Sequence, residues 1–339
     1  MKILTLVGTR PELIRLSIII SKLNKITEHI LVHTGQNYDY ELSQIFFKEL
    51  KIKKPDYFLD ARGTFSEQIS IMFPKFEKII KKEKPDRVLI LGDTNSSLCS
   101  IICKRLQIPV FHMEAGNRSY DNRMPEEVNR KLIDHSADIN FTYTKLAKNY
   151  LISEGINADR IINVGSPMMQ VIEENKKKIS KSKILKKLNL KKNSFFLFSF
   201  HREENVDNKY NIIKFFDVLN WLYKKYGKQI IISTHSRTQK RIKNNFITNK
   251  KQNINFLKPF NFSDYIKLQE NSSIVFSDSG TLTEETSILK TKAIMLRDSH
   301  ERPEGMEEAT TIMCGLDINK ISTAINILES NNKHKIVDD

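Results

Sequence analysis

Residues 2–25 read KILTLVGTRPELIRLSIIISKLNK and contain the first complete unit of the fold. The apolar run at 2–7 predicts a buried strand, and Gly8 permits a tight turn after it. Pro11 suits the first turn of a helix, where its missing N–H costs nothing, and the amphipathic stretch 13–25 continues that helix. A strand, a short turn and a covering helix together form the first part of a βαβ unit.

The same alternation of short β-rich runs and longer amphipathic stretches continues along the chain. It predicts parallel sheets covered by helices on both faces, in two doubly wound, Rossmann-like α/β domains. One Lys- and Asn-rich stretch interrupts the alternation, so we expect domains at 1–166 and 167–330 and a fraying polar tail at 331–339. Strands are predicted at 2–7, 30–34, 87–91, 110–113, 139–142, 195–200, 229–234, 254–257, 273–277 and 293–296.

The composition favours a cytoplasmic protein. The chain has 339 residues, 40% of them hydrophobic, but no run of eighteen apolar residues that could span a membrane. Its N-terminus turns polar too early for a signal peptide. The three cysteines at 99, 103 and 314 follow neither a disulfide framework nor a zinc-site spacing. We therefore expect no membrane partner and no bound metal.

The net charge of +15 raises the question of nucleic-acid binding. The lysines are spread through amphipathic segments, and no interleaved aromatic platform or reading helix accompanies them. This pattern favours a solvated basic surface, and no nucleic-acid partner is expected. Part of the excess charge is able to steer an anionic nucleotide substrate.

Ligands of open α/β sheets bind beyond the carboxyl ends of the strands, so the residues that follow the strands are the first candidates. Arg10 lies at the positive start of a helix, which suits phosphate, although a structural turn is an equal alternative. Asp93 follows a strand, where helix capping is the plainer interpretation. Capping explains Glu114 less well, because Glu is a poor N-cap. Glu126 and Arg130 share one face of a predicted helix, and a surface ion pair is their alternative role.

In the second half, His201 and Arg202 directly follow an apolar run. One switchable and one permanent cation suit a diphosphate. Ser279 and Gly280 precede a predicted helix and can offer backbone N–H groups to phosphate, while Glu285 can accept from ribose hydroxyls. The full dinucleotide fingerprint is absent, so no nicotinamide site is predicted.

Seven motifs in a fixed order carry a resemblance to a known family. They are GTRPE at 8–12, GDT at 92–94, EAGNR at 114–118, PEEVNR at 125–130, HREEN at 201–205, DSGT at 278–281 with EE at 284–285, and ERPE at 301–304. On these motifs the chain resembles the non-hydrolysing UDP-N-acetylglucosamine 2-epimerase family over nearly its whole length. The stretches 34–42, 113–118 and 233–238 resemble its branch that makes UDP-N-acetyl-L-fucosamine from a 6-deoxy-talose precursor.

The resemblance implies a glycosyltransferase type B-like fold, with the active site in a cleft between two Rossmann-like domains. It implies inversion of sugar carbon 2 by elimination and re-addition of UDP through a glycal, in the service of bacterial surface polysaccharide synthesis. It implies no cofactor and no essential metal, a UDP-N-acetylhexosamine substrate, and a homodimer.

Carried over position by position, the resemblance also implies roles for single residues. The catalytic set is Asp93, Glu114, Glu126 and His201. The substrate-binding set is Arg10, Arg15, Arg130, Arg202, Tyr265, Ser279, Gly280, Glu285 and Arg302.

Two departures from the family pattern are visible. Arg15 stands where Lys is usual, which keeps the charge but changes its geometry. The Gln-His-x-x-Met signature of allosterically activated members reads QNYDY at 36–40, so activation by a second UDP-GlcNAc is not implied. The rival interpretations are a type B glycosyltransferase, a hydrolysing 2-epimerase and an inactive UDP-sugar-binding protein. The carboxylate-rich first half argues against the glycosyltransferase.

Overall fold

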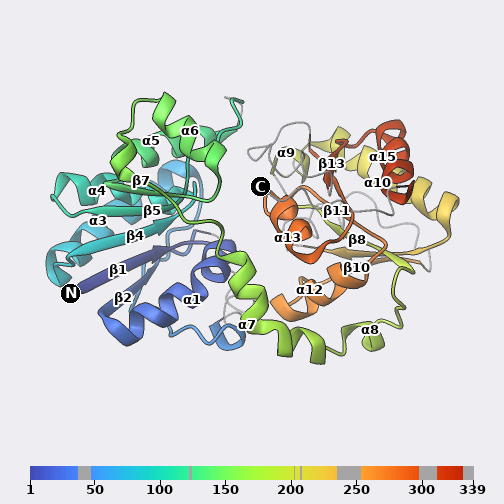
Figure 1. Ribbon diagram of the computed structural model, residues 1–339, viewed down its shortest axis with the longest axis horizontal. Coiled ribbons are helices and arrows are strands. Elements are labelled where there is room, and N and C mark those ends of the chain that lie inside the picture. The colour runs from blue at the N-terminus through green and yellow to red at the C-terminus, as the bar shows by residue number, and fades with distance from the viewer. Residues whose placement is uncertain are drawn as a thin grey trace. The chain divides into compact units, whose positions relative to one another are not determined.

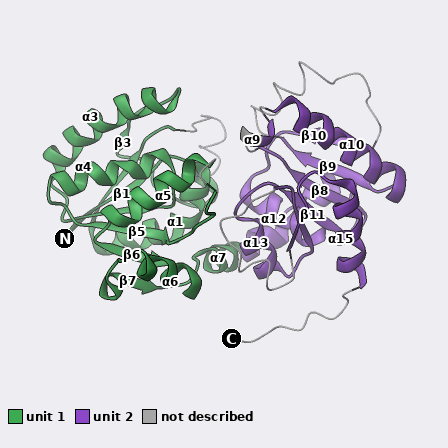
Figure 2. Cartoon of the chain, turned by 90° about the horizontal axis from the view of Figure 1, so that it is seen from above, with its two compact units in different colours: residues 1–175 green, residues 176–339 purple. Residues whose placement is uncertain are grey.

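The computed structural model describes residues 1–36, 47–121, 124–201, 203–206, 208–234, 253–297 and 311–330, with no side-chain description for 203 and 204. The chain divides into two compact units, Met1–Asn175 and Lys176–Asp339 (Figure 2). The division falls within one helix, α7 (Met168–Lys181), a little after the boundary expected at 166. Each unit is built on its own parallel sheet.

The first unit contains a seven-stranded sheet in the order β3-β2-β1-β4-β5-β6-β7. All neighbouring strands run parallel. The order reverses between β1 and β4, because the chain builds outward from β1 in one direction and then from β4 in the other. The strands are β1 (Lys2–Val7), β2 (Glu28–His33), β3 (Tyr57–Phe58), β4 (Arg87–Leu91), β5 (Val110–Ala115), β6 (Ile139–Thr142) and β7 (Ile161–Asn163).

Helices cover the first sheet, and alternate residues of its strands point to opposite faces. Leu4 and Leu6 of β1 share a buried cluster with Phe76 of α3 and Cys103 of α4. On α1, Leu16 and Ile20 are buried, and this helix contacts β1 and β2 (Figure 1). The helices of this unit are α1 (Arg10–Ile26), α3 (Phe65–Glu83), η1 (Asn95–Cys99), α4 (Ser100–Arg105), α5 (Pro125–Ser136), α6 (Lys145–Ser153) and η2 (Ala158–Arg160).

The second unit repeats this architecture with six parallel strands in the order β10-β9-β8-β11-β12-β13. Here the order reverses between β8 and β11. The strands are β8 (Phe195–Ser199), β9 (Gln229–Ser233), β10 (Ile254–Leu257), β11 (Ile274–Ser277), β12 (Ala293–Met295) and β13 (Thr311–Met313).

Both faces of the second sheet are buried. Phe196 and Phe198 of β8 belong to one cluster with α10 and α15, where the rings of Phe198 and Phe276 stack at 4.4 Å. Leu197 and Val275 belong to another cluster with α8, α12 and α13. The helices are α8 (Ile184–Lys187), α9 (Glu203–Val206), α10 (Lys209–Tyr226), α12 (Phe262–Asn271), α13 (Leu282–Leu289) and α15 (Ile318–Ser330). The predicted α/β class with two doubly wound parallel sheets is confirmed.

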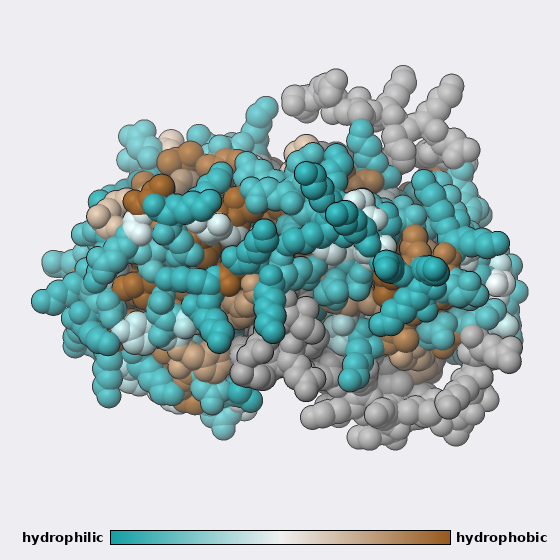
Figure 3. All heavy atoms as spheres, turned by 90° about the horizontal axis from the view of Figure 1, so that it is seen from below, coloured by the Kyte–Doolittle hydropathy of each residue, from teal (hydrophilic) through white to brown (hydrophobic). Residues whose placement is uncertain are grey.

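The described surface is mostly polar. Hydrophilic side chains cover much of the face shown in Figure 3, and apolar side chains show between them in separate groups. Within the described residues, no helix combines the length and the apolar content that crossing a membrane requires.

Glu12 fixes the turn between β1 and α1. Its Oε2 accepts the backbone N–H groups of Gly8 at 2.9 Å and Thr9 at 2.6 Å, and its Oε1 accepts the Thr94 hydroxyl at 3.0 Å. Gly8 is required by close approach, because a Cβ there would lie 1.9 Å from the Ser96 Oγ. Burial raises the pKa of Glu12 to about 7, although its hydrogen bonds oppose that shift.

The raised pKa of Glu12 predicts a pH-dependent stability. The folded chain binds this proton more tightly than the unfolded chain, whose carboxyl has a pKa of 4.5. The stabilisation is therefore complete below that value and is lost as the pH rises through about 7. We expect the free energy of unfolding to fall by on the order of 2–3 kcal/mol across this window, and Glu12→Gln to remove that dependence.

Urea unfolding at several pH values between about 5 and 8 measures this effect. Glu67→Gln is the matched control, because Glu67 caps α3 in the same way but is exposed, and its hydrogen bond from the Thr64 backbone lowers its pKa. Equal pH slopes for the original chain and Glu12→Gln would contradict the prediction.

Candidate functional site

Two of the predicted residues of the first unit, Arg10 and Asp93, lie at its topological switch point. Arg10 follows β1 and Asp93 follows β4, the two adjacent strands between which the strand order reverses. Loops at such a point diverge and leave a crevice beyond the carboxyl ends of the strands. Gly92 takes a φ of +72°, which a glycine adopts without strain and which turns the chain from β4 toward Asp93.

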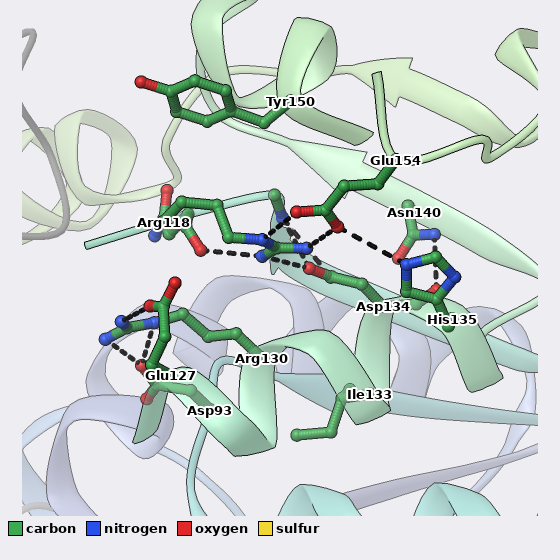
Figure 4. Close-up of polar contacts among 12 residues, drawn as sticks. Asp93, Arg118, Glu127, Arg130, Ile133, Asp134, His135, Asn140, Tyr150 and Glu154 are labelled. Atoms are coloured by element: carbon green, nitrogen blue, oxygen red, sulfur yellow. Dashed lines mark hydrogen bonds and ion pairs between the residues drawn. The ribbon is translucent and has the colours of Figure 1, made fainter. Parts of the chain in front are cut away.

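Asp93 is held by Arg130, which lies on α5. The Arg130 Nη2 and Nε atoms lie 2.7 and 2.8 Å from the Asp93 Oδ2 (Figure 4). The Asn129 amide donates to the Asp93 carbonyl at 2.9 Å. Two consecutive residues of α5 therefore fix both the side chain and the backbone of Asp93.

Arg130 has a second carboxylate partner that the sequence analysis missed. The Arg130 Nη1 lies 2.7 Å from the Glu127 Oε2, and this carboxylate also accepts the Ser119 N–H and hydroxyl at 3.0 Å each. Burial opposes ionisation, but these hydrogen bonds outweigh it and hold the pKa of Glu127 below its ordinary value. A spacing of three residues on a helix also brings side chains together, so the sequence carried this signal as well as the spacing of Glu126. The Glu126 side chain is partly exposed.

Glu114 occupies a strained position at the end of β5. Its φ of +67° lies in the left-handed region, at the point where the register between β5 and β6 shifts. For a residue with a Cβ this conformation costs roughly 1–2 kcal/mol. Such outliers concentrate at functional sites. The Glu114 carboxylate pairs with the guanidinium of Arg15, a residue of α1 that is 4% exposed.

A buried ion network holds the loop that follows β5. The Arg118 guanidinium, whose side chain is fully buried, lies 2.7 Å from the Asp134 Oδ2 and 2.6 Å from the Glu154 Oε2 (Figure 4). It ties the loop after β5 to α5 and to the end of α6. Arg118 stands in the EAGNR motif, but Asp134 and Glu154 gave no signal in the sequence, because their meeting depends on tertiary packing.

The predicted residues of the second unit lie at its own switch point. His201 follows β8 and Asp278 follows β11, the two strands between which the order reverses. The buried Asp278 carboxylate accepts the His201 backbone N–H at 3.1 Å, and its Oδ1 lies 3.2 Å from the His201 Nδ1. The imidazole is 39% exposed. Asp278 thus anchors one edge of a ring that solvent reaches.

Ser279 and Gly280 form the turn that leads into α13. The Ser279 N–H donates to the Ser277 hydroxyl at 3.0 Å, which fixes the start of this turn. Glu285 accepts the Thr281 hydroxyl at 2.9 Å and the Gln269 amide at 2.7 Å. The predicted ribose anchor is therefore held in place by neighbours on α12 and at the start of its own helix.

The remaining predicted residues are placed less fully. Tyr265, on α12, is partly buried against the cluster that includes Leu197. Arg202, Arg302 and the tail at 331–339 lie outside the described residues. In the ranges that the structure describes, no group of three or more His, Cys, Asp or Glu side chains is arranged to hold a metal ion.

Comparison with known proteins identifies the family. The family model described as UDP-N-acetylglucosamine 2-epimerase matches residues 21–338. The UDP-N-acetylglucosamine 2-epimerase of Methanococcus maripaludis is 37% identical over 342 residues, which cover 98% of this chain and 93% of the relative.

Solved structures give the same result. The UDP-N-acetylglucosamine 2-epimerase of Rickettsia bellii is 46% identical with a TM-score of 0.89, covering 99% of this chain and 89% of its own. The enzyme of Methanocaldococcus jannaschii, solved in complex with UDP-GlcNAc and UDP, is 38% identical with a TM-score of 0.92 and coverages of 99% and 94%. This chain belongs to the UDP-N-acetylglucosamine 2-epimerase family, whose members are isomerases with two Rossmann-like domains.

Proposed function

We propose that this chain is a non-hydrolysing UDP-2-acetamido-sugar 2-epimerase that works by elimination and re-addition of UDP. The observation that carries the proposal is the chemistry at the two switch points. The first unit presents carboxylates held by arginines, and the second presents a carboxylate-anchored histidine beside a turn of small residues. The family and the UDP-GlcNAc and UDP in the related complex support this assignment.

Elimination avoids a costly direct deprotonation. Carbon 2 of an N-acetyl sugar carries no strongly acidifying group, so a free carbanion there is expensive. When a base takes the carbon 2 proton as the bond from carbon 1 to the UDP oxygen breaks, UDP leaves with the bonding electron pair and a neutral glycal forms. Re-addition then returns a proton to the opposite face of carbon 2 and UDP to carbon 1. Stabilising the leaving UDP lowers the barrier most.

Proton transfer on two faces of one carbon requires more than one positioned group. We propose Asp93, Glu114 and Glu126 for these transfers. Asp93 is paired with Arg130 and Glu114 with Arg15, so each carboxylate is held in a defined direction rather than rotating freely.

We propose that the second unit binds UDP. His201 would contact the diphosphate and the leaving oxygen, and Ser279 and Gly280 would offer backbone N–H groups to a phosphate. Arg10, a residue of the first unit, is also proposed as a diphosphate contact. The Glu285 carboxylate, held by Gln269 and Thr281, would accept from ribose hydroxyls. By position in the family pattern, Arg202, Tyr265 and Arg302 complete this set.

The sugar is proposed to be UDP-GlcNAc or the 6-deoxy precursor of UDP-N-acetyl-L-fucosamine. The stretches that favour the 6-deoxy branch, 34–42 and 233–238, fall largely outside the described residues. Incubating the purified protein separately with each nucleotide sugar decides between them. We expect a 2-epimeric UDP-sugar from the 6-deoxy compound at the higher kcat/KM. Free N-acetylmannosamine as the only sugar product would instead indicate a hydrolysing enzyme.

We further propose that the enzyme is a cytoplasmic homodimer that supplies bacterial surface polysaccharide synthesis. The family resemblance supports the dimer, and the UDP-sugar substrate supports the cytoplasm, where such nucleotides are made. Sedimentation velocity measures the assembly directly, and a monomer at working concentrations would contradict the dimer.

Turnover in heavy water should place deuterium at carbon 2 of the product, because the returning proton comes from an acid that exchanges with solvent. Mass spectrometry or proton NMR of the product measures this incorporation. Epimerised product without deuterium at carbon 2 would rule out elimination and re-addition.

Glu114→Gln should reduce turnover by roughly 10²–10⁴-fold while UDP binding is retained, because the amide keeps the size of the side chain but cannot take a proton. Steady-state kinetics and UDP titration calorimetry measure the two properties. Glu77→Gln, a change on the exposed face of α3, is the control for a neutral substitution. Loss of UDP binding in a folded Glu114→Gln protein would assign Glu114 to binding instead.

A further inference from the structure

His112 is a buried histidine between the two strand ends that carry Asp93 and Glu114. It lies on β5, two residues before Glu114, and is 2% exposed. Its Nε2 lies 3.1 Å from the carbonyl oxygen of Gly92, the residue before Asp93. Its Nδ1 lies 2.9 Å from the Asp134 Oδ1. The Nε2 contact has the geometry of a hydrogen bond, whereas the Nδ1 contact is a close approach only.

The Nε2 contact fixes one proton of the ring. A carbonyl oxygen can only accept, so the Nε2 must carry a proton. On the other side of the ring, Asp134 is fully buried, and burial opposes its ionisation. The contacts from His112 and Arg118 outweigh burial and hold the pKa of the Asp134 carboxyl below its ordinary value.

The imidazole also helps to hold the backbone next to Asp93. The Gly92 N–H donates to the Met113 carbonyl at 2.9 Å, and the Gly92 carbonyl faces the His112 Nε2. The peptide bond between Gly92 and Asp93 is therefore held by β5 on its N-terminal side, and the Asn129 amide holds the Asp93 carbonyl that follows it. Removing the ring would release one of these constraints.

We propose that His112 is a positioning residue whose Nε2–H donates to the Gly92 carbonyl and so orients the turn that carries the Asp93 carboxylate, two residues along β5 from Glu114. This inference rests on the catalytic roles proposed above for these two carboxylates. A buried histidine that only fills space predicts no specific loss of kcat when its donor is removed.

The test compares substitutions. His112→Phe removes the donor to the Gly92 carbonyl, and we expect kcat to fall by up to roughly 100-fold, as for a small misplacement of a catalytic group, with KM and UDP affinity within a few-fold of the original. His112→Gln keeps a donor for the Gly92 carbonyl and should restore part of the lost kcat. His29→Gln is the control, because His29 is also buried in this sheet but sits at the start of β2, near the opposite ends of the strands.

These measurements distinguish a failure of the proposed catalytic roles of Asp93 and Glu114 from a failure of the proposed role of His112. If Asp93→Asn and Glu114→Gln both keep full turnover, the proposed catalytic roles fail. If those two variants lose turnover while folded His112→Phe and His112→Gln behave like His29→Gln, only the role of His112 is overturned. Should His112→Phe not fold, His112→Leu, which also lacks a donor, takes its place in this comparison.

Discussion

The candidate chemistry depends on one constraint of parallel sheets. A chain that builds a parallel sheet outward from two adjacent strands must send its loops apart at that point, and the carboxyl ends of those two strands are left open. In the first unit these strands are β1 and β4, and in the second they are β8 and β11. Arg10 and Asp93 follow the first pair, and His201 and Asp278 follow the second. The sequence therefore places its unusual residues where the backbone leaves space for a ligand.

Ion pairs then fix the directions of the side chains around these open strand ends. Arg15, Arg118 and Arg130 are each nearly buried, and each lies against carboxylates. Buried ion pairs add little net stability, because desolvation costs about as much as the attraction returns. Their clearer effect here is geometric, since a guanidinium offers donors in a rigid plane. The left-handed backbone conformation of Glu114 likewise costs stability and fixes the direction of its side chain.

The sequence predicts a feature well when the residues that form it are close together in the chain. All ten predicted strands are present, because apolar runs between turn residues are a local pattern. The short strands β3, β7 and β13, of two or three residues each, were missed because they are too short to show a period. Asp93 and Glu114 were found because they directly follow strands. Asp134 and His112 were missed because their partners come from elements distant in the sequence. Glu127 was missed although its partner Arg130 lies three residues away on the same helix.

The central claim is that the residues at the two switch points bind one substrate. A crystal structure of this protein with UDP and a 2-acetamido sugar tests it most directly. The account predicts the diphosphate within hydrogen-bonding distance of His201 and the backbone of Ser279 and Gly280. It also predicts sugar carbon 2 against the carboxylates of Asp93 and Glu114. A nucleotide sugar bound away from either group of residues would contradict it.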